Sequence, residues 1–269
     1  HSNNQLHSHS IVADMIEVKN LYKSFPNAEV LHDISVCFEE KKTNMIIGQS
    51  GSGKTVLLKC IVGLLDAKKG KILYDDVVFN KLNFKKKKEI RKNIGMVFQG
   101  GALFDSETVE QNVKFPLDMF TTMTEQQKLN RVNECLERVN IVNANNLYPA
   151  EISGGMQKRV AIARAIALNP RYLFFDEPIS GLDPKTAIRI DRLIGEITRD
   201  IETTTIINTH DMNSVMEIGD NVIFLFEGKK WWEGSRKDIL HSDNPELNDF
   251  VFATNLAKTV RDLRKSGHS

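Results

Sequence analysis

A run of glycines and hydroxyl side chains that ends in a lysine is the first feature able to do chemistry. It reads, in order, Gly48, Gln49, Ser50, Gly51, Ser52, Gly53, Lys54 and Thr55. This run matches the phosphate-binding pattern GxxxxGK[S/T] in full. Glycines let successive backbone N–H groups converge on phosphate oxygens, and a helix that follows them points its positive end at the same anion. We therefore expect Lys54 to contact the β- and γ-phosphates of a nucleotide and Thr55 to hold Mg²⁺.

Two carboxylates follow the apolar run at residues 172–175. A phosphate-binding loop needs a carboxylate at the end of a buried strand to help hold the metal, and Asp176 has that position. Glu177 comes next, where it can orient and deprotonate a water for in-line attack on a phosphate. Strands often end in an acidic residue, so the pair gains its meaning from the loop. For residues 48–55, the alternative is a glycine-rich turn that binds no ligand, and the flanking strand and helix patterns argue against it.

Strand and helix patterns alternate around these residues. Apolar runs predict strands at residues 16–18, 30–38, 43–47, 94–98, 172–175, 205–208 and 221–226, with strand and turn at 71–79. Helices are predicted at residues 55–65, 124–140, from 155 to just before Pro170, and 184–200, with residues 102–168 mostly helical. Thr124 and Gln127 have the spacing of a capping box. This alternation predicts an α/β fold with a mainly parallel sheet covered by helices on both faces.

Composition narrows the class of protein. The 269 residues are 41% hydrophobic and carry a formal net charge of +1, so no net field favours nucleic acid. The basic run at residues 85–88 is interpreted as a solvated face, and no nucleic-acid partner is expected. Three cysteines without metal-like spacing fit reduced thiols. No apolar run approaches the roughly 18 residues that span a bilayer. A membrane channel, if this protein serves one, must come from another subunit.

The order of further motifs resembles the ATPases of ABC transporters over essentially all of residues 15–240. Residues 152–156 read ISGGM, similar to the LSGGQ signature of that family. In the family, the signature of one subunit closes over the ATP that the other subunit's phosphate loop holds. The resemblance implies ATP and Mg²⁺ as cofactors, ATP hydrolysis, a homodimer, and contact of Ser153, Gly154 and Gly155 with the partner's ATP.

Other positions of the family pattern follow along the chain. Phe25 matches the aromatic residue that stacks on adenine, with Tyr22 as its competitor. Gln99 matches the glutamine that senses Mg²⁺ and connects to the membrane subunit. Asp183 ends the SGLD loop that communicates across the dimer, and His210 matches the switch histidine that contacts the γ-phosphate and holds the attacking water. The resemblance thus implies Glu177, His210 and Gln99 as catalytic residues, and Thr55, Gln99 and Asp176 as the Mg²⁺ site.

The same resemblance implies a P-loop NTPase fold with a RecA-like core, an antiparallel β subdomain and a helical signature subdomain. We expect the ATPase domain at residues 15–250, with the helical subdomain at about 100–168. Residues 1–14 lack the apolar segment of a signal peptide and are expected to be a tag or a disordered leader, with a metal-binding tract as the alternative. Residues 251–269 are expected to be a C-terminal extension whose helical stretch, 255–264, is either a partner-docking segment or a frayed end.

Residues 99–106, 108–109 and 112–117, together with Met156, resemble the ATPase of Mla-type bacterial lipid transporters. That resemblance implies phospholipid transport with a permease, an MCE-type lipid-binding protein and a small regulatory subunit, at the cytoplasmic face of the inner membrane. Leu103 and Phe104 are candidate anchors for a permease helix, although Phe104 fits the core equally well.

Three other functions are compatible with parts of the sequence. An ABC importer of a small polar solute shares every motif of the ATP site. A soluble ABC ATPase of translation or DNA repair usually carries two ATPase units or long insertions, and one unit without basic excess argues against it. A P-loop nucleotide kinase needs neither Ser153-Gly154-Gly155 nor His210.

Overall fold

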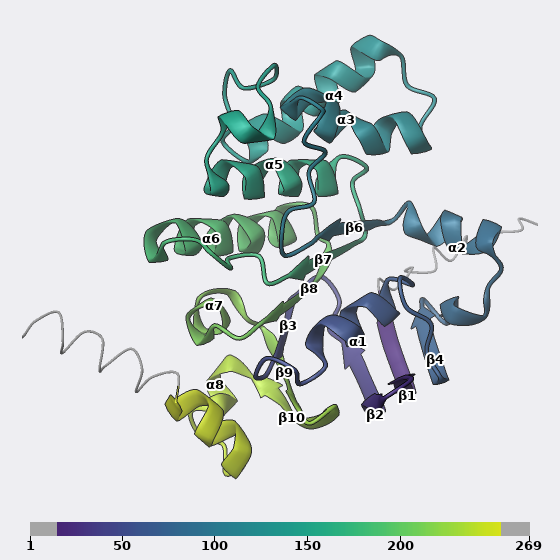
Figure 1. The fold of residues 1–269 in the computed structure, drawn as a ribbon, viewed down its shortest axis with the longest axis vertical. Coiled ribbons are helices and arrows are strands. Elements are labelled where there is room, and N and C mark those ends of the chain that lie inside the picture. The colour runs from purple at the N-terminus through teal and green to yellow at the C-terminus, as the bar shows by residue number, and fades with distance from the viewer. Residues whose placement is uncertain (1–14, 254–269) are drawn as a thin grey trace, which may run out of the picture.

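The computed structural model describes residues 15–253 (Figure 1). The expectations for residues 1–14 and 255–264 lie outside these described residues. The strands are β1 (Ile16–Phe25), β2 (Ala28–Phe38), β3 (Thr43–Ile47), β4 (Lys69–Tyr74), β5 (Val77–Val78), β6 (Ile94–Val97), β7 (Tyr172–Asp176), β8 (Thr204–Thr209), β9 (Asn221–Phe226) and β10 (Lys229–Ser235). The helices are α1 (Lys54–Ile61), α2 (Phe84–Arg91), α3 (Val109–Phe120), α4 (Glu125–Arg138), α5 (Gly154–Ile166), α6 (Pro184–Asp200), α7 (Met212–Ile218) and α8 (Arg236–Ile239).

The strands form two sheets. A six-stranded sheet has the order β10-β9-β3-β8-β7-β6, in which every pair is parallel except β9 with β10. A four-stranded antiparallel sheet has the order β2-β1-β4-β5. The predicted fold class, an α/β P-loop ATPase with a parallel core and an antiparallel β subdomain, is confirmed.

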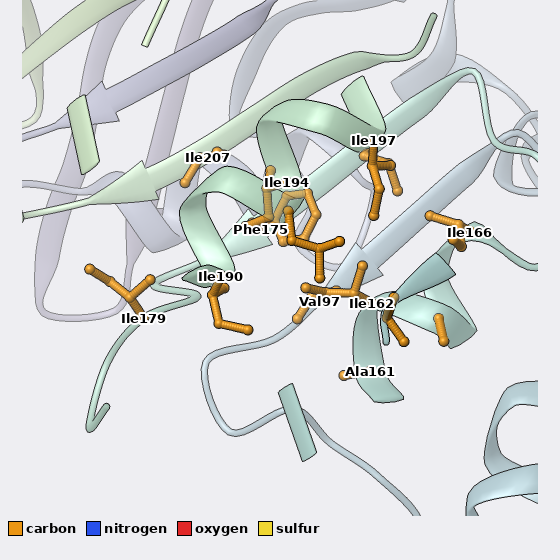
Figure 2. Close-up of a cluster of buried hydrophobic side chains, with 14 of the residues drawn as sticks. Val97, Ala161, Ile162, Ile166, Phe175, Ile179, Ile190, Ile194, Ile197 and Ile207 are labelled. Carbon is orange, nitrogen blue, oxygen red and sulfur yellow. The ribbon is translucent and has the colours of Figure 1, made fainter. Parts of the chain in front are cut away.

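The parallel strands bury both of their faces, because successive side chains point to opposite sides. In β3, Met45 and Ile47 join a cluster with α5 and α6, while Ile46 joins a second cluster with α1 and the antiparallel sheet. Figure 2 shows the first cluster, in which isoleucines of α5 and α6 meet Val97 and Phe175 of the sheet. Helix α1 therefore lies on one face of the core sheet, and α5 and α6 lie on the other (Figure 1).

Several predicted elements differ from the structure at their ends. The helix after the phosphate loop stops at Ile61 instead of residue 65, because Gly63 takes a φ of 79° and a β-carbon there would lie 2.8 Å from the ring of Phe79. The basic run at residues 85–88 belongs to α2, which the sequence analysis did not predict and which has no buried residue. Helix α6 and strands β3 and β9 match their predicted bounds. Across residues 15–253, no helix is both long enough and apolar enough to cross a membrane.

The buried side chain of Asn112 on α3 organises the loop that leads from β6 to that helix. Its Oδ1 accepts a hydrogen bond from the N–H of Phe104 at 2.8 Å. Its Nδ2 donates to the carbonyls of Phe104, Glu107 and Thr108 at 3.0–3.2 Å. One amide thus makes four hydrogen bonds to the backbone of the irregular loop, two of them to carbonyls that also accept a backbone N–H, so the loop has a fixed shape beside α3.

We expect Asn112→Ala to lower the free energy of unfolding by about 2–3 kcal/mol, because four partly buried hydrogen bonds are lost at once. Chemical denaturation of the purified chain measures this change. Asn130→Ala is the matched control, since Asn130 makes an exposed bond with Gln126 on α4, and its effect should stay within about 0.5 kcal/mol. Equal effects of the two substitutions would contradict the role given to Asn112.

Candidate functional site

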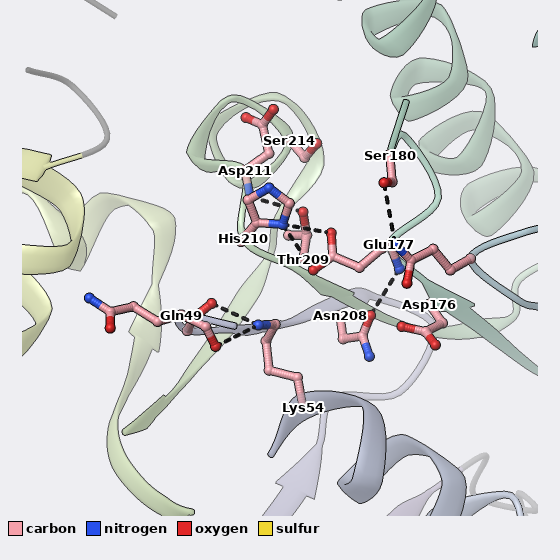
Figure 3. A network of polar contacts seen from close by, with 12 residues as sticks. Gln49, Lys54, Asp176, Glu177, Ser180, Asn208, Thr209, His210, Asp211 and Ser214 are labelled. Carbon is pink, nitrogen blue, oxygen red and sulfur yellow. Dashed lines mark hydrogen bonds and ion pairs between the residues drawn. The ribbon is translucent and has the colours of Figure 1, made fainter. Parts of the chain in front are cut away.

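The register of the parallel strands places the predicted chemical groups at one edge of the core sheet. Ile47 of β3 pairs with Thr209 of β8, and Asp176 of β7 pairs with Asn208 of β8. The residues that follow these strands are Gly48, His210 and Glu177, so all three emerge at the carboxyl edge. Figure 3 shows the side chains of Lys54, Asp176, Glu177 and His210 gathered there.

The loop between β3 and α1 has the shape of an anion cradle. Gly53 is the N-cap of α1 with a φ of 103°, and a β-carbon on it would lie 2.8 Å from a methyl of Leu31. Gly51 has a φ of 82° and faces open space, with nothing within 4 Å of its β-carbon position. The Ser52 hydroxyl is buried and has no hydrogen-bond partner among the described residues. A phosphate suits this loop, because it accepts hydrogen bonds from hydroxyl and backbone N–H donors.

Lys54 is buried and its ammonium lies inside the loop, where it donates to the carbonyls of Gly48 at 2.7 Å and Gln49 at 3.0 Å. Burial lowers the pKa of Lys54, while the nearby carboxylates of Glu177 and Asp176 act in the opposite direction. Burial destabilises the charged form of the ammonium, and the negative charge of a triphosphate in this loop would offset that cost.

Thr55 and Asp176 meet across the end of the sheet. The hydroxyl of Thr55 lies 3.2 Å from Oδ1 of Asp176 and donates a hydrogen bond to it. Oxygen donors are the ligands Mg²⁺ prefers, and this ion commonly binds through one or two protein groups together with substrate phosphates and water. The pair therefore fits the Mg²⁺ site expected from the sequence.

Glu177 and His210 form a contact that joins two strands. Nδ1 of His210 lies 3.0 Å from both carboxylate oxygens of Glu177 (Figure 3). The backbone of Glu177 has a φ of 48°, which is uncommon for a residue with a side chain. Its N–H donates to Oδ1 of Asn208 at 2.9 Å and to the Asn208 carbonyl at 3.1 Å. Asn208 thus maintains the turn that aims the carboxylate toward His210.

Gln99 follows β6 and lies beside the SGLD loop. Its Nε2 is 3.4 Å from Oγ of Ser180, and its carbonyl accepts a hydrogen bond from the ammonium of Lys158 on α5. Arg164, also on α5, donates to the carbonyls of Gly101 at 2.9 Å and Ala102 at 3.0 Å. Helix α5, which follows the signature, is therefore hydrogen-bonded to the loop that begins at Gln99.

The signature residues lie apart from the phosphate loop of the same chain. Ser153 caps α5 by accepting a hydrogen bond from the N–H of Met156 at 3.2 Å. Ser153, Gly154 and Gly155 line a cleft of about 550 Å³ with Asp183 and residues of α6, and no residue of the phosphate loop lines it. Asp183 caps α6 through a 3.0 Å bond from the N–H of Thr186. A single chain therefore does not bring the predicted site residues Ser153, Gly154, Gly155 and Asp183 to Lys54.

Phe25 lies at the exposed end of β1, where the chain turns into β2. The ammonium of Lys23 is 5.1 Å from the centre of its ring. Tyr22 is less exposed and has the ammonium of Lys69 at 5.6 Å. Of the two, Phe25 offers more open ring surface to a stacking base. Strand β2 also runs beside the phosphate loop, since the carbonyl of Val30 is 3.4 Å from the β-carbon position of Gly53.

Sequence reasoning missed two residues that support this site. Asn208 was expected only as the last residue of a strand, although an amide at the buried end of a parallel strand signals a fixed hydrogen bond. Lys158 was not singled out at all. It is buried, and desolvation lowers its pKa. A lysine one helical turn after the signature gives no sign by itself that it reaches the Gln99 loop.

A family model and the similar proteins of known name point to the same protein family. A family model described as ABC transporter matches residues 31–180. The chain is 37% identical over 236 residues to the probable ribonucleotide transport ATP-binding protein mkl of Mycobacterium leprae, covering 88% of this chain and 68% of that protein. It is 36% identical over 253 residues to the methionine import ATP-binding protein MetN of Campylobacter jejuni, covering 88% and 75%.

Solved structures agree with these relatives. The dimeric ATP-binding cassette MJ0796 bound to ADP and Pi has a TM-score of 0.76 and 30% identity, covering 82% of this chain and 98% of that one. The protein cbiO1 from Clostridium perfringens, part of the transporter complex cbiONQ, has a TM-score of 0.78 and 28% identity, covering 95% and 98%. The names of these proteins do not refer to lipids, so the Mla-type expectation gains no support from them. The chain belongs to the ABC transporter family, as one of its ATP-binding and ATP-hydrolysing subunits.

Proposed function

We propose that ATP binds with its phosphates in the loop from Gly48 to Thr55 and is hydrolysed beside Glu177 and His210. The observation that carries this proposal is the contact of His210 Nδ1 with both Glu177 oxygens at 3.0 Å, at the strand edge that also holds Lys54. Asp176 and Thr55 hold Mg²⁺, with Gln99 approaching it from β6. Phe25 stacks on the adenine, a contact worth ~1–3 kcal/mol by analogy with other base–aromatic pairs.

The roles of the side chains follow from their chemistry. The bound Mg²⁺ supplies charge that neutralises phosphate oxygens during transfer. Glu177 accepts a proton from the attacking water, because a carboxylate positioned at this edge can act as a general base. His210 donates a hydrogen bond from Nδ1 to that carboxylate and keeps it in one orientation. Lys54 binds the β- and γ-phosphates and so fixes the reacting phosphorus near Glu177.

A second copy of the chain completes the site. Ser153 and the Gly154 and Gly155 N–H groups stand at the N-terminus of α5, and such an end attracts an anion. Helix α5 packs on the face of the core sheet opposite to α1. We therefore propose a head-to-tail homodimer in which these groups close over the γ-phosphate on the partner subunit, with Asp183 at the contact between the copies.

A hollow beside β6 is the proposed dock for a membrane permease. This cavity of about 280 Å³ is lined by residues of β6, α3, α5 and the loop after β6, and Phe98, Phe104 and Phe115 are among them. Phe104 is 41% exposed and meets Phe115 edge to face at 4.8 Å, with Arg164 over its ring at 5.6 Å. Leu103 instead packs against the core. Phe104 is thus the better permease anchor of the two. A peripheral position at the cytoplasmic face of the membrane follows from such docking.

The transported substrate is best sought among small polar solutes. The relatives named for methionine import and ribonucleotide transport support this class. Phospholipid transport with an MCE-type protein and a small regulatory subunit is the second candidate. It rests on the resemblance of residues 99–106 and 112–117, several of which line the hollow beside β6.

Glu177→Gln should keep ATP affinity and lower the hydrolysis rate by at least ~10²-fold, because the shape remains and the base is lost. His210→Ala should lower turnover by about 10- to 100-fold, since the carboxylate loses the group that orients it. Steady-state ATPase assays and calorimetry of ATP binding measure both effects. If Glu177→Gln hydrolyses ATP like the unaltered chain, another residue is the base.

The substrate class is tested by purifying the chain with its membrane subunit and reconstituting the complex in vesicles. Uptake of labelled methionine or a ribonucleotide and transfer of a fluorescent phospholipid are then measured with ATP. We expect uptake of a polar solute and no phospholipid transfer. The complex carrying Glu177→Gln is the control and should do neither. Phospholipid transfer without solute uptake would reject the importer and favour the second candidate, while the ATPase assignment would stand.

A further inference from the structure

A buried polar contact joins the two helices that follow the site loops. Asp191 lies in α6 and Ser214 lies in α7, and they are 2% and 1% exposed. The Ser214 hydroxyl donates a hydrogen bond to Oδ2 of Asp191 at 2.7 Å. The second carboxylate oxygen, Oδ1, is buried and has no hydrogen-bond partner among the described residues. A carboxyl in such a place lowers stability compared with a well-packed apolar residue, which suggests that it has a role other than stabilising the fold.

Both helices begin within two residues of the proposed site. Helix α6 starts after Asp183, and α7 starts two residues after His210. Helix α7 has only seven residues, too few to hold its own shape and place without packing. The His210 side chain is 59% exposed, so packing does not fix it. Its direction depends on where the chain leaves β8 and where α7 begins.

Other contacts also hold α7. Asp211 caps its first turn by accepting a hydrogen bond from the N–H of Asn213 at 2.7 Å, and Met212 and Val215 are buried in the core. Arg236 donates to the carbonyls of Met216 and Glu217 at 2.9 and 3.1 Å, at its C-terminal end. Glu217 also accepts a hydrogen bond from Nε of Arg192 on α6 at 2.5 Å, in an exposed ion pair. The cap and the core contacts lie within the first turn or are apolar, whereas the hydrogen bond of Ser214 joins this turn, which leads from His210, to a polar group of α6.

We propose that Asp191 and Ser214 are positioning residues for ATP hydrolysis: their hydrogen bond fixes the first turn of α7 on α6 and thereby holds His210 toward Glu177. This inference rests on the proposed function, which assigns hydrolysis to Glu177 and His210. It also gives the SGLD loop a mechanical connection to His210, since α6 begins at that loop. Burial raises the pKa of Asp191 to about 7, with Asp211 and Glu217 adding to the rise and the Ser214 bond opposing it.

The test compares four variants of the full chain by ATPase kinetics and chemical denaturation. Ser214→Ala removes the donor, and Asp191→Asn keeps an oxygen acceptor for Ser214. The double variant Asp191→Leu with Ser214→Ala removes both polar groups, which can leave stability nearly unchanged. Glu217→Gln is the matched control, because it weakens the exposed tie between the same two helices.

We expect Ser214→Ala to lower kcat by at least about 10-fold with little change in KM, within the ~10²-fold that a 1 Å misplacement can cost. Asp191→Asn should retain most of the activity. The double variant should regain the stability of the unaltered chain while its kcat stays low. Glu217→Gln should hydrolyse ATP at the rate of the unaltered chain.

Two results would overturn the proposal. One is a double variant whose kcat recovers together with its stability, because the contact would then be structural only. The other is a normal kcat in the double variant and in Ser214→Ala alike. Glu177→Gln, assayed in parallel, separates this failure from a wider one. If Glu177→Gln is inactive while the Asp191 and Ser214 variants are unaffected, only the positioning role fails. If Glu177→Gln is active, the assignment of the hydrolytic site fails and the positioning role fails with it.

Discussion

The parallel pairing of β3, β8 and β7 is the constraint on which the rest of the site depends. Because Ile47 pairs with Thr209, and Asn208 pairs with Asp176, the chain leaves these strands at one edge. A shift of register by one residue would turn each side chain to the other face of the sheet. It would displace Lys54, Glu177 and His210 relative to one another and put side chains into the wrong one of the two packed clusters. Burial of both faces of the sheet therefore enforces the geometry that the chemistry needs.

The loop after β6 links this edge to the helical part of the chain. Lys158 and Arg164 of α5 bind its carbonyls from one side, and Asn112 of α3 binds it further along. A displacement of α5, which carries the signature, must therefore move Gln99 and the hollow near Phe104. This is a physical route by which closure on ATP can reach a membrane subunit. Three of these four contacts are partly buried, and we expect the loop to move together with the two helices that bind it.

Sequence could predict the elements of the site where a local pattern is specific or gains specificity from a neighbouring one. The phosphate loop and helix 184–200 are specific over a few residues, and the pair Asp176 and Glu177 gains its meaning from the phosphate loop. The contacts of Lys158 with Gln99 and of Ser214 with Asp191 could not be predicted, since they join segments 59 and 23 residues apart. Helix α2 was missed because its polar composition carries no apolar period, and Asn83 alone marks its start.

The central claim is that one chain supplies an incomplete ATP site that a second copy closes. Sedimentation of the Glu177→Gln chain with Mg²⁺ and ATP, with and without the added substitution Ser153→Phe, tests it most directly. The account predicts a dimer holding two ATP molecules for Glu177→Gln, and a monomer that still binds one ATP when Ser153 is also replaced. A Ser153 variant that loses ATP binding as a monomer, or one that dimerises on ATP as before, would contradict it.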